Sequence, residues 1–178
     1  MNRLVQPEHA TTDLSPKTSM RRLEEAERTR QDILTVAAHE FSEKGLAGAR
    51  VDEIAATTKT SKRMIYYYFG SKAGLYLAAL EAKYKKVRDT EHNLDLLHMA
   101  PEPALRCLVA VTFDHHLNNE DYIRMVMNEN MNRAKYLKQS ENVQALNRPA
   151  IQILSDIYKR GVASGVFREG LDPADIHA

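Results

Sequence analysis

The most informative residues of this sequence are basic and aromatic side chains between Ser61 and Lys72. Ile65 and Phe69 stand four positions apart, so on a helix they share one face, which we expect to pack inward. The opposite face then carries Lys62, Arg63, Tyr66 and Tyr67, with Met64 and Tyr68 at its edges. Such a face suits the major groove of DNA, where Lys and Arg reach guanine acceptors, Met contacts the thymine methyl and Tyr hydroxyls bond phosphates.

A face of this kind works only if a second helix holds it at a fixed angle. The preceding segment Val51–Thr58 has the apolar spacing of a short helix, with Ile54 and Ala55 turned inward. Ser61 is a good N-cap for the helix that follows it. Two short helices a few residues apart predict a helix-turn-helix motif at about residues 50–69.

The rest of the chain also has helical periodicity. A stripe of apolar residues from Ile33 to Phe41 stops at Gly45, and its helix starts either at Thr29, with Asp32 completing the cap, or near Arg21. Further helices are expected from Ser71 toward Leu97, and over Pro103–Asn118, Asp121–Ala134, Ser140–Ala163 and from Pro173 onward. No segment alternates with period two, so the sequence predicts an all-α protein.

Composition excludes several classes of protein. With 43% hydrophobic and 28% charged residues, the chain of 178 residues is not wholly disordered. Its longest apolar run, Leu75–Leu80, is too short to span a membrane, no secretory signal is present, and the single cysteine fits a reducing compartment. We therefore expect a soluble cytoplasmic protein with no membrane partner. Residues 1–88 carry 16 Lys and Arg against 11 Asp and Glu, which suits a polyanion-binding N-terminal part, although charge alone is more typical of a solvated helix face.

The segment Thr29–Leu80 resembles the DNA-binding domain of the TetR family of transcriptional regulators. The resemblance lies in the ending Phe41-Ser-Glu-Lys-Gly45, in Val51 with Ile54-Ala55, and in the string Ser61-Lys-Arg-Met-Ile-Tyr-Tyr-Tyr-Phe-Gly-Ser-Lys72. It implies base contacts for Lys62, Arg63 and Met64, and phosphate or base-edge contacts for Tyr66, Tyr67 and Tyr68, although Tyr68 fits a half-buried scaffold position equally well. Lys72, at the positive end of the next helix, is implied as a phosphate contact.

Two positions depart from the family pattern. The family usually has glycine where Lys59 stands, so Lys59 is expected at positive φ. It usually has Thr or Ser where Arg50 stands, so the helix from Val51 is expected to lack a side-chain cap, and Arg50 becomes a candidate phosphate contact. For Arg28 and Arg30, phosphate contact and plain solvation remain equal alternatives.

The resemblance also implies a domain organisation. A flexible arm is expected at residues 1–26, the DNA-binding domain at 27–87 and a helical effector-binding domain at 88–178. Asp172-Pro173 is a strong helix start, but only five residues follow Pro173. We therefore expect that the last, dimer-forming helices of the family are missing from this chain.

The function implied is that of a repressor that binds a palindromic operator as a homodimer and is released by a small-molecule effector, with no cofactor, metal or catalytic residue. Candidate effector-binding residues are His115, His116, Met125, Asn128 and Met131. His115 and His116 are adjacent, so they are expected to point to different sides of their helix. Two alternatives remain: an all-α metal-dependent hydrolase using both histidines with Asp114, and a protein-interaction module whose basic face meets an acidic partner.

Overall fold

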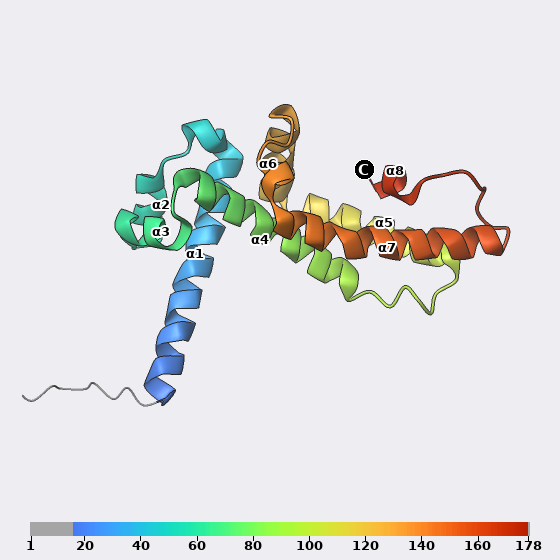
Figure 1. The fold of residues 1–178 in the computed structure, drawn as a ribbon, viewed down its shortest axis with the longest axis horizontal. Helices are drawn as coiled ribbons and strands as arrows, with labels where there is room; N and C mark the ends of the chain where they lie inside the picture. The colour runs from blue at the N-terminus through green and yellow to red at the C-terminus, as the bar shows by residue number, and fades with distance from the viewer. Residues whose placement is uncertain (1–15, 178) are drawn as a thin grey trace, which may run out of the picture.

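The computed structural model describes residues 16–177, in which every regular element is a helix. These elements are α1 (Pro16–Gly48), α2 (Val51–Thr57), α3 (Lys62–Phe69), α4 (Lys72–His92), α5 (Pro101–Leu117), α6 (Glu120–Met131), the 3-10 turn η1 (Leu137–Gln139), α7 (Glu141–Ala163) and α8 (Pro173–His177). Figure 1 shows α1, α2 and α3 at one end, α5 packed along α7 at the other, and α4 running from the first group to the second. The all-α prediction is confirmed.

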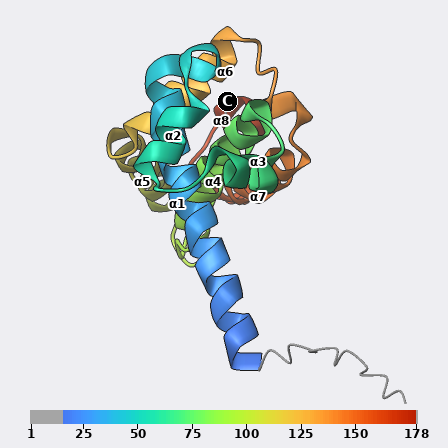
Figure 2. The same cartoon turned by 90° about the vertical axis from the view of Figure 1, so that its left-hand side faces the viewer.

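Helix α1 is longer at its N-terminal end than the sequence indicated. It begins at Pro16, so neither a start at Thr29 nor one near Arg21 is right, and the part of the predicted arm over residues 16–26 is helical; residues 1–15 lie outside the described chain. The Thr29 hydroxyl bonds the Glu25 carbonyl of its own helix and caps nothing. In Figure 2 the first turns of α1 project beyond the other helices. The predicted end at Gly45 is a kink, with φ 63° there.

Other helix ends follow from local hydrogen bonds. Ser71 accepts from the Gly74 N–H at 3.0 Å and so caps α4, as predicted. A Cβ at Gly74 would lie 2.1 Å from the Phe69 carbonyl oxygen, so only glycine allows the tight passage from α3 into α4. Helix α4 ends at His92 rather than toward Leu97.

Helix α6 ends at Met131, before the predicted Ala134. Arg133 and Ala134 both have positive φ, 58° and 54°, which breaks the helix. The buried carboxylate of Glu129 stabilises this turn, because it accepts bonds from the backbone N–H groups of Tyr136 and Leu137, at the start of η1, and from the Tyr76 hydroxyl at 3.0 Å.

The larger hydrophobic core joins the helix-turn-helix end to the rest of the molecule. Helix α4 contributes residues along most of its length to this core, which also receives residues from α1, α2, α3, α6 and α7. The α4 members include Leu75, Tyr76, Ala79, Leu80, Tyr84 and Val87, and α6 adds Tyr122 and Met125. The boundary expected near residue 87 therefore falls inside one continuous helix. None of the helices over residues 16–177 is both long enough and apolar enough to span a membrane.

Candidate nucleic-acid interface

Helix α3 presents the face that the sequence predicted. Ile65 is completely buried, whereas Tyr67 is 80% exposed and Met64 40% exposed. Lys62, Arg63 and Tyr66 are also exposed. The groups suited to DNA contact therefore point away from the core, and the apolar group between them anchors the helix.

Phe69 is the second inward residue of α3, and it is half-buried rather than buried. Its ring packs against the core, and the guanidinium of Arg30 lies 5.8 Å from the ring centroid. Arg30 also pairs with Glu27 at 3.3 Å. This places Arg30 against the end of α3, while Arg28 is exposed.

The N-terminus of α3 is fixed by two contacts. The Ser61 side chain accepts from the Met64 N–H at 3.1 Å, so the predicted cap is confirmed. The ammonium of Lys62 lies 2.8 Å from the carboxylate of Asp52 on α2. This hydrogen bond and charge pair raise the pKa of Lys62 and lower that of Asp52, so both groups stay ionised at neutral pH.

The structure shows both expected departures from the family pattern, one in the turn before α3 and one before α2. Lys59 has φ 53°, a conformation that glycine adopts more easily. Arg50 precedes α2 without a side-chain cap, and its N–H donates instead to the Glu40 carboxylate at 3.0 Å. Its guanidinium is exposed and lies 3.8 Å from the carboxylate of Glu53.

Two predicted contact residues are already engaged within the protein. The ammonium of Lys72 donates to the Ala47 carbonyl at 3.1 Å, at the end of α1. Tyr68 is half-buried and packs against the core, with its ring 5.6 Å from that of Tyr67. Of the two alternatives for Tyr68, the scaffold position matches its surroundings.

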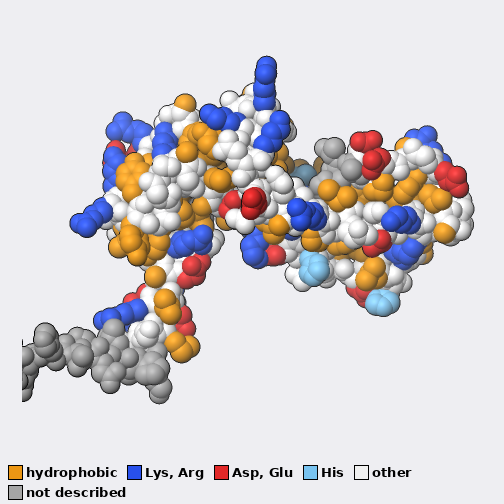
Figure 3. Space-filling view, viewed as in Figure 1, with side chains coloured by type: hydrophobic (Ala, Val, Ile, Leu, Met, Phe, Trp, Pro, Cys, Tyr) orange, Lys and Arg blue, Asp and Glu red, His pale blue; other side chains and the backbone are white. Residues whose placement is uncertain are grey.

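The surface around α3 is basic. Figure 3 shows lysine and arginine side chains projecting from the end that carries α2 and α3. Within residues 16–177, Arg63 takes part in no ion pair, so its guanidinium is available to a ligand without breaking one. An exposed basic helix end next to exposed tyrosines fits a phosphate-lined groove.

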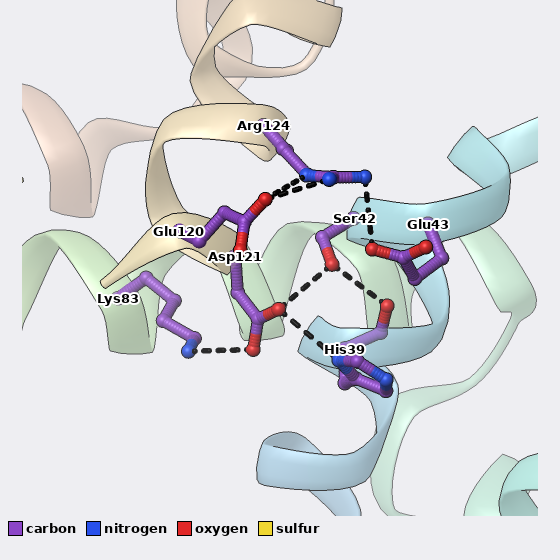
Figure 4. A network of polar contacts seen from close by, with 7 residues as sticks. All are labelled: His39, Ser42, Glu43, Lys83, Glu120, Asp121 and Arg124. Carbon is purple, nitrogen blue, oxygen red and sulfur yellow. Dashed lines mark hydrogen bonds and ion pairs between the residues drawn. The ribbon is translucent and has the colours of Figure 1, made fainter. Parts of the chain in front are cut away.

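A polar cluster ties α1 to α6 and α4 behind this surface (Figure 4). One carboxylate oxygen of Asp121 lies 2.9 Å from the Ser42 hydroxyl and 3.2 Å from Nδ1 of His39. The other lies 3.3 Å from the Lys83 ammonium. The sequence analysis missed this junction, because its partners are separated by 38 to 82 positions along the chain.

A second ion pair extends the same junction. Arg124 of α6 reaches Glu43 of α1 at 2.9 Å and Glu120 of its own helix at 2.6 Å. Figure 4 shows the two clusters next to each other, bridging the same pair of helices. These contacts connect α6 to α1, which packs against α2 of the helix-turn-helix.

The five predicted effector-binding residues do not form one site. Met125 is completely buried in the larger core, whereas Met131 is 75% exposed. Asn128 is half-buried. None of the five lines the hollow between α4 and α7 or the one between α5 and the segment Val166–Phe167.

The two histidines were expected to diverge, but both contact one tyrosine. The rings of His115 and His116 have centroids 5.9 Å and 5.8 Å from that of Tyr122. Burial, reinforced by the nearby charge of Lys86, lowers the pKa of His115. Across residues 16–177, no group of three or more His, Cys, Asp or Glu side chains is arranged to hold a metal ion.

Comparison with protein families gives two matches that together cover most of the chain. Residues 33–79 match the model described as bacterial regulatory proteins, tetR family. Residues 101–178 match the model described as tetracyclin repressor-like, C-terminal domain. The first match contains α2 and α3, and the second contains α5, α6 and α7.

Individual relatives agree with these matches. The HTH-type transcriptional repressor NicS of Pseudomonas putida is 37% identical over 150 residues, which are 84% of this chain and 71% of that protein. Among solved structures, the putative transcriptional regulator SCO4942 of Streptomyces coelicolor has 30% identity and a TM-score of 0.63, with 84% of this chain and 73% of that chain covered. The regulator FadR of Bacillus subtilis, solved with stearoyl-CoA, has a TM-score of 0.60, 82% and 77% coverage, and 20% identity, which indicates a shared fold.

Proposed function

Because the chain belongs to the TetR family of bacterial transcriptional regulators, we propose that it is a repressor that binds a palindromic operator as a homodimer and leaves it when a small-molecule effector binds. The observation that carries the proposal is the division of α3, with Ile65 completely buried and Arg63 beside it exposed and unpaired among the described residues. The P. putida relative is named a transcriptional repressor. Family membership also decides against the hydrolase based on His115 and His116.

The candidate contact residues on and around α3 divide into two roles. Arg63 and Lys62 read base edges, since a guanidinium or ammonium bonds the O6 and N7 acceptors of guanine in the major groove. Lys62 must first exchange its partner Asp52 for the DNA. Tyr66, Tyr67, Lys72 and Arg50 contact phosphates, and Met64 contacts a thymine methyl.

A homodimer sets two copies of α3 about 34–36 Å apart, one turn of B-DNA, so that they enter successive major grooves. Each half-site alone binds weakly, and the connection between the two raises the affinity of the pair. The protein acts where its operator lies, in the cytoplasm.

The effector acts through α4. The family match over residues 101–178 supports an effector-binding part, and the FadR neighbour was solved with a bound ligand. Helix α4 begins three residues after α3 ends and reaches α7 with its last turns. A ligand that prefers a different position of α4 shifts the spacing of the two recognition helices and so weakens operator binding.

The test is footprinting of the protein on the DNA upstream of its own gene. We expect two protected half-sites related by two-fold symmetry, with centres one helical turn or a small multiple of it apart. Competition with a scrambled duplex of equal length and composition is the control. Equal affinity for the two duplexes, at a salt concentration near physiological, would overturn the proposal.

A further inference from the structure

A cavity of about 150 Å³ lies between the C-terminal end of α4 and the middle of α7. Helix α7 supplies its apolar wall: Leu146, Pro149, Ala150 and Ile153. Helix α4 supplies its polar wall, which includes Arg88 and Glu91. An apolar pocket with a few convergent polar groups is the usual form of a small-molecule site.

The polar wall contains a buried ion pair that is held in place by further hydrogen bonds. The side chains of Arg88 and Glu91 are 13% and 6% exposed, and Nη1 of Arg88 lies 2.5 Å from the Glu91 carboxylate. Nε of Arg88 donates to the Asn147 side chain at 3.1 Å, and Thr112 donates to Glu91 at 3.3 Å. Within the described residues 16–177, no acceptor is found for Nη2 of Arg88, so its N–H groups remain as donors for a bound molecule.

One residue of the α7 wall has a carbonyl group that lacks its usual helical donor. Pro149 lies inside α7 and has no N–H, so it cannot donate to the Ala145 carbonyl one turn earlier. Ala145 is itself part of the cavity lining. The cavity thus has a donor on one side, and the other side includes a residue whose carbonyl lacks its usual helical donor.

The charges around the cavity disfavour an anion. Its titratable lining consists of Arg88, Asp89, Glu91 and His92, which is one permanent cation against two carboxylates. Lys85 pairs with Asp89 at 2.5 Å but does not line the cavity. An anionic ligand at Nη2 would be repelled by the carboxylates of Glu91 and Asp89, whereas an uncharged hydrogen-bonding group can use Nη2 without that repulsion and leave the ion pair intact.

We propose that this cavity is the effector site and that it takes a small uncharged molecule with a single ring and one amide or carbonyl group. This inference rests on the proposed function. The volume supports the size, since an apolar cavity of about 150 Å³ in another protein holds one benzene molecule. A ligand at this site would affect DNA binding through α4, because Arg88 and Glu91 lie on the helix whose first turn follows α3.

Benzamide and benzoate test the proposal, because they have nearly the same shape and differ in charge. Binding to the full chain is measured by calorimetry. We expect benzamide to bind with a dissociation constant of about 1 mM or lower, from the affinity typical of ligands with few atoms, and benzoate to bind at least tenfold more weakly. Benzoate binding as tightly as benzamide, or neither binding, would overturn the proposal.

Matched variants locate the binding. Ala145→Leu places bulk in the cavity mouth at an exposed helix position and should weaken benzamide at least tenfold. Ala163→Leu makes the same change at an exposed position of α7 outside the cavity and should leave affinity within twofold. Equal affinity of the two variants would contradict the assignment. Circular dichroism of both variants checks that the helices are intact.

Failure here can be told apart from failure of the proposed function. Loss of benzamide binding with operator footprints intact overturns the effector site alone. If benzamide binds as described but the protein binds its operator and the scrambled duplex equally well, the repressor proposal is overturned. The cavity then remains assigned as a ligand site. Release of the operator at saturating benzamide in the wild type and in Ala163→Leu, with none in Ala145→Leu, supports both.

Discussion

The ammonium of Lys62 and the carboxylate of Asp52 lie 2.8 Å apart, so the first residue of α3 is paired with α2 in the free protein. The pair links the position of the recognition helix to its neighbour. It also places a negative charge beside the surface proposed to face phosphates. Both consequences can be separated by substitution.

We expect Asp52→Asn to increase affinity for all DNA sequences. The change frees Lys62 and removes repulsion between Asp52 and phosphate, so affinity at low salt should rise by about two- to fivefold and the gain should shrink as salt is added. Fluorescence anisotropy across a salt series measures both effects. Glu141→Gln, at an exposed position distant in sequence from α3, is the control. A fall in affinity with Asp52→Asn would mean that the pair mainly orients α3.

Arg63→Ala and Lys72→Ala should change DNA binding in two different ways. Loss of a base contact relaxes preference at one operator position and costs about 1–3 kcal/mol on the preferred sequence. Loss of a phosphate contact weakens all sequences alike and reduces the salt slope by about one. Competition assays with single-base operator variants distinguish the two patterns. Unchanged binding in both variants would show that the assigned interface is wrong.

Asp121→Asn should loosen the junction between α1 and α6. Burial alone would raise the pKa of Asp121, but hydrogen bonds from Ser42 and His39 and the charge of Lys83 bring it below its ordinary value. The carboxylate therefore stabilises the fold above the unfolded-state pKa, about 3.9, and this contribution is lost as the pH falls through the lower folded-state pKa.

The variant should lower the free energy of unfolding by about 1–2 kcal/mol at pH 7, and the difference from wild type should shrink below about pH 3. Urea denaturation at the two pH values measures it. Glu102→Gln removes an exposed carboxylate paired with Arg106 and should change stability by about 0.5 kcal/mol or less. A pH-independent difference would show that the charge of Asp121 is not what stabilises the junction.

Gly74→Ala should strongly destabilise the folded protein. Its Cβ would meet the backbone of Phe69 at 2.1 Å, and backbone cannot move aside as a flexible side chain can. We expect a loss of about 1–3 kcal/mol in stability, together with weaker operator binding, because α3 is displaced. Gly48→Ala is the matched control, since its Cβ would approach nothing closer than 3.4 Å. Thermal unfolding that is equal in the two variants would contradict the prediction.

The sequence predicted the local features of the interface. Ile65 and Phe69 at helical spacing were enough to orient α3, and Ser61 and Ser71 were enough to start two helices, because capping and periodicity depend on residues a few positions apart. Thr29 misled for the same reason, since its hydroxyl can bond within a helix as well as cap one.

What the sequence did not predict depends on tertiary contact. Nothing near Asp121 indicates Ser42 or Lys83, and nothing near Arg88 indicates Asn147, 59 positions away. Met125 was proposed for an effector site, but only the packing of α6 on the core reveals that it is completely buried.

One helix, α4, carries side chains of a single apolar core from the turn after α3 to within a few residues of its own end. The helix-turn-helix end and the helices that follow it therefore share one core, and heat should unfold them in one cooperative step. In a chimera that joins the first three helices of this protein to a relative's remaining helices, the core residues from the two proteins would not be matched to each other. The chimera would fold well only if the facing residues of α6 were transplanted together with α4.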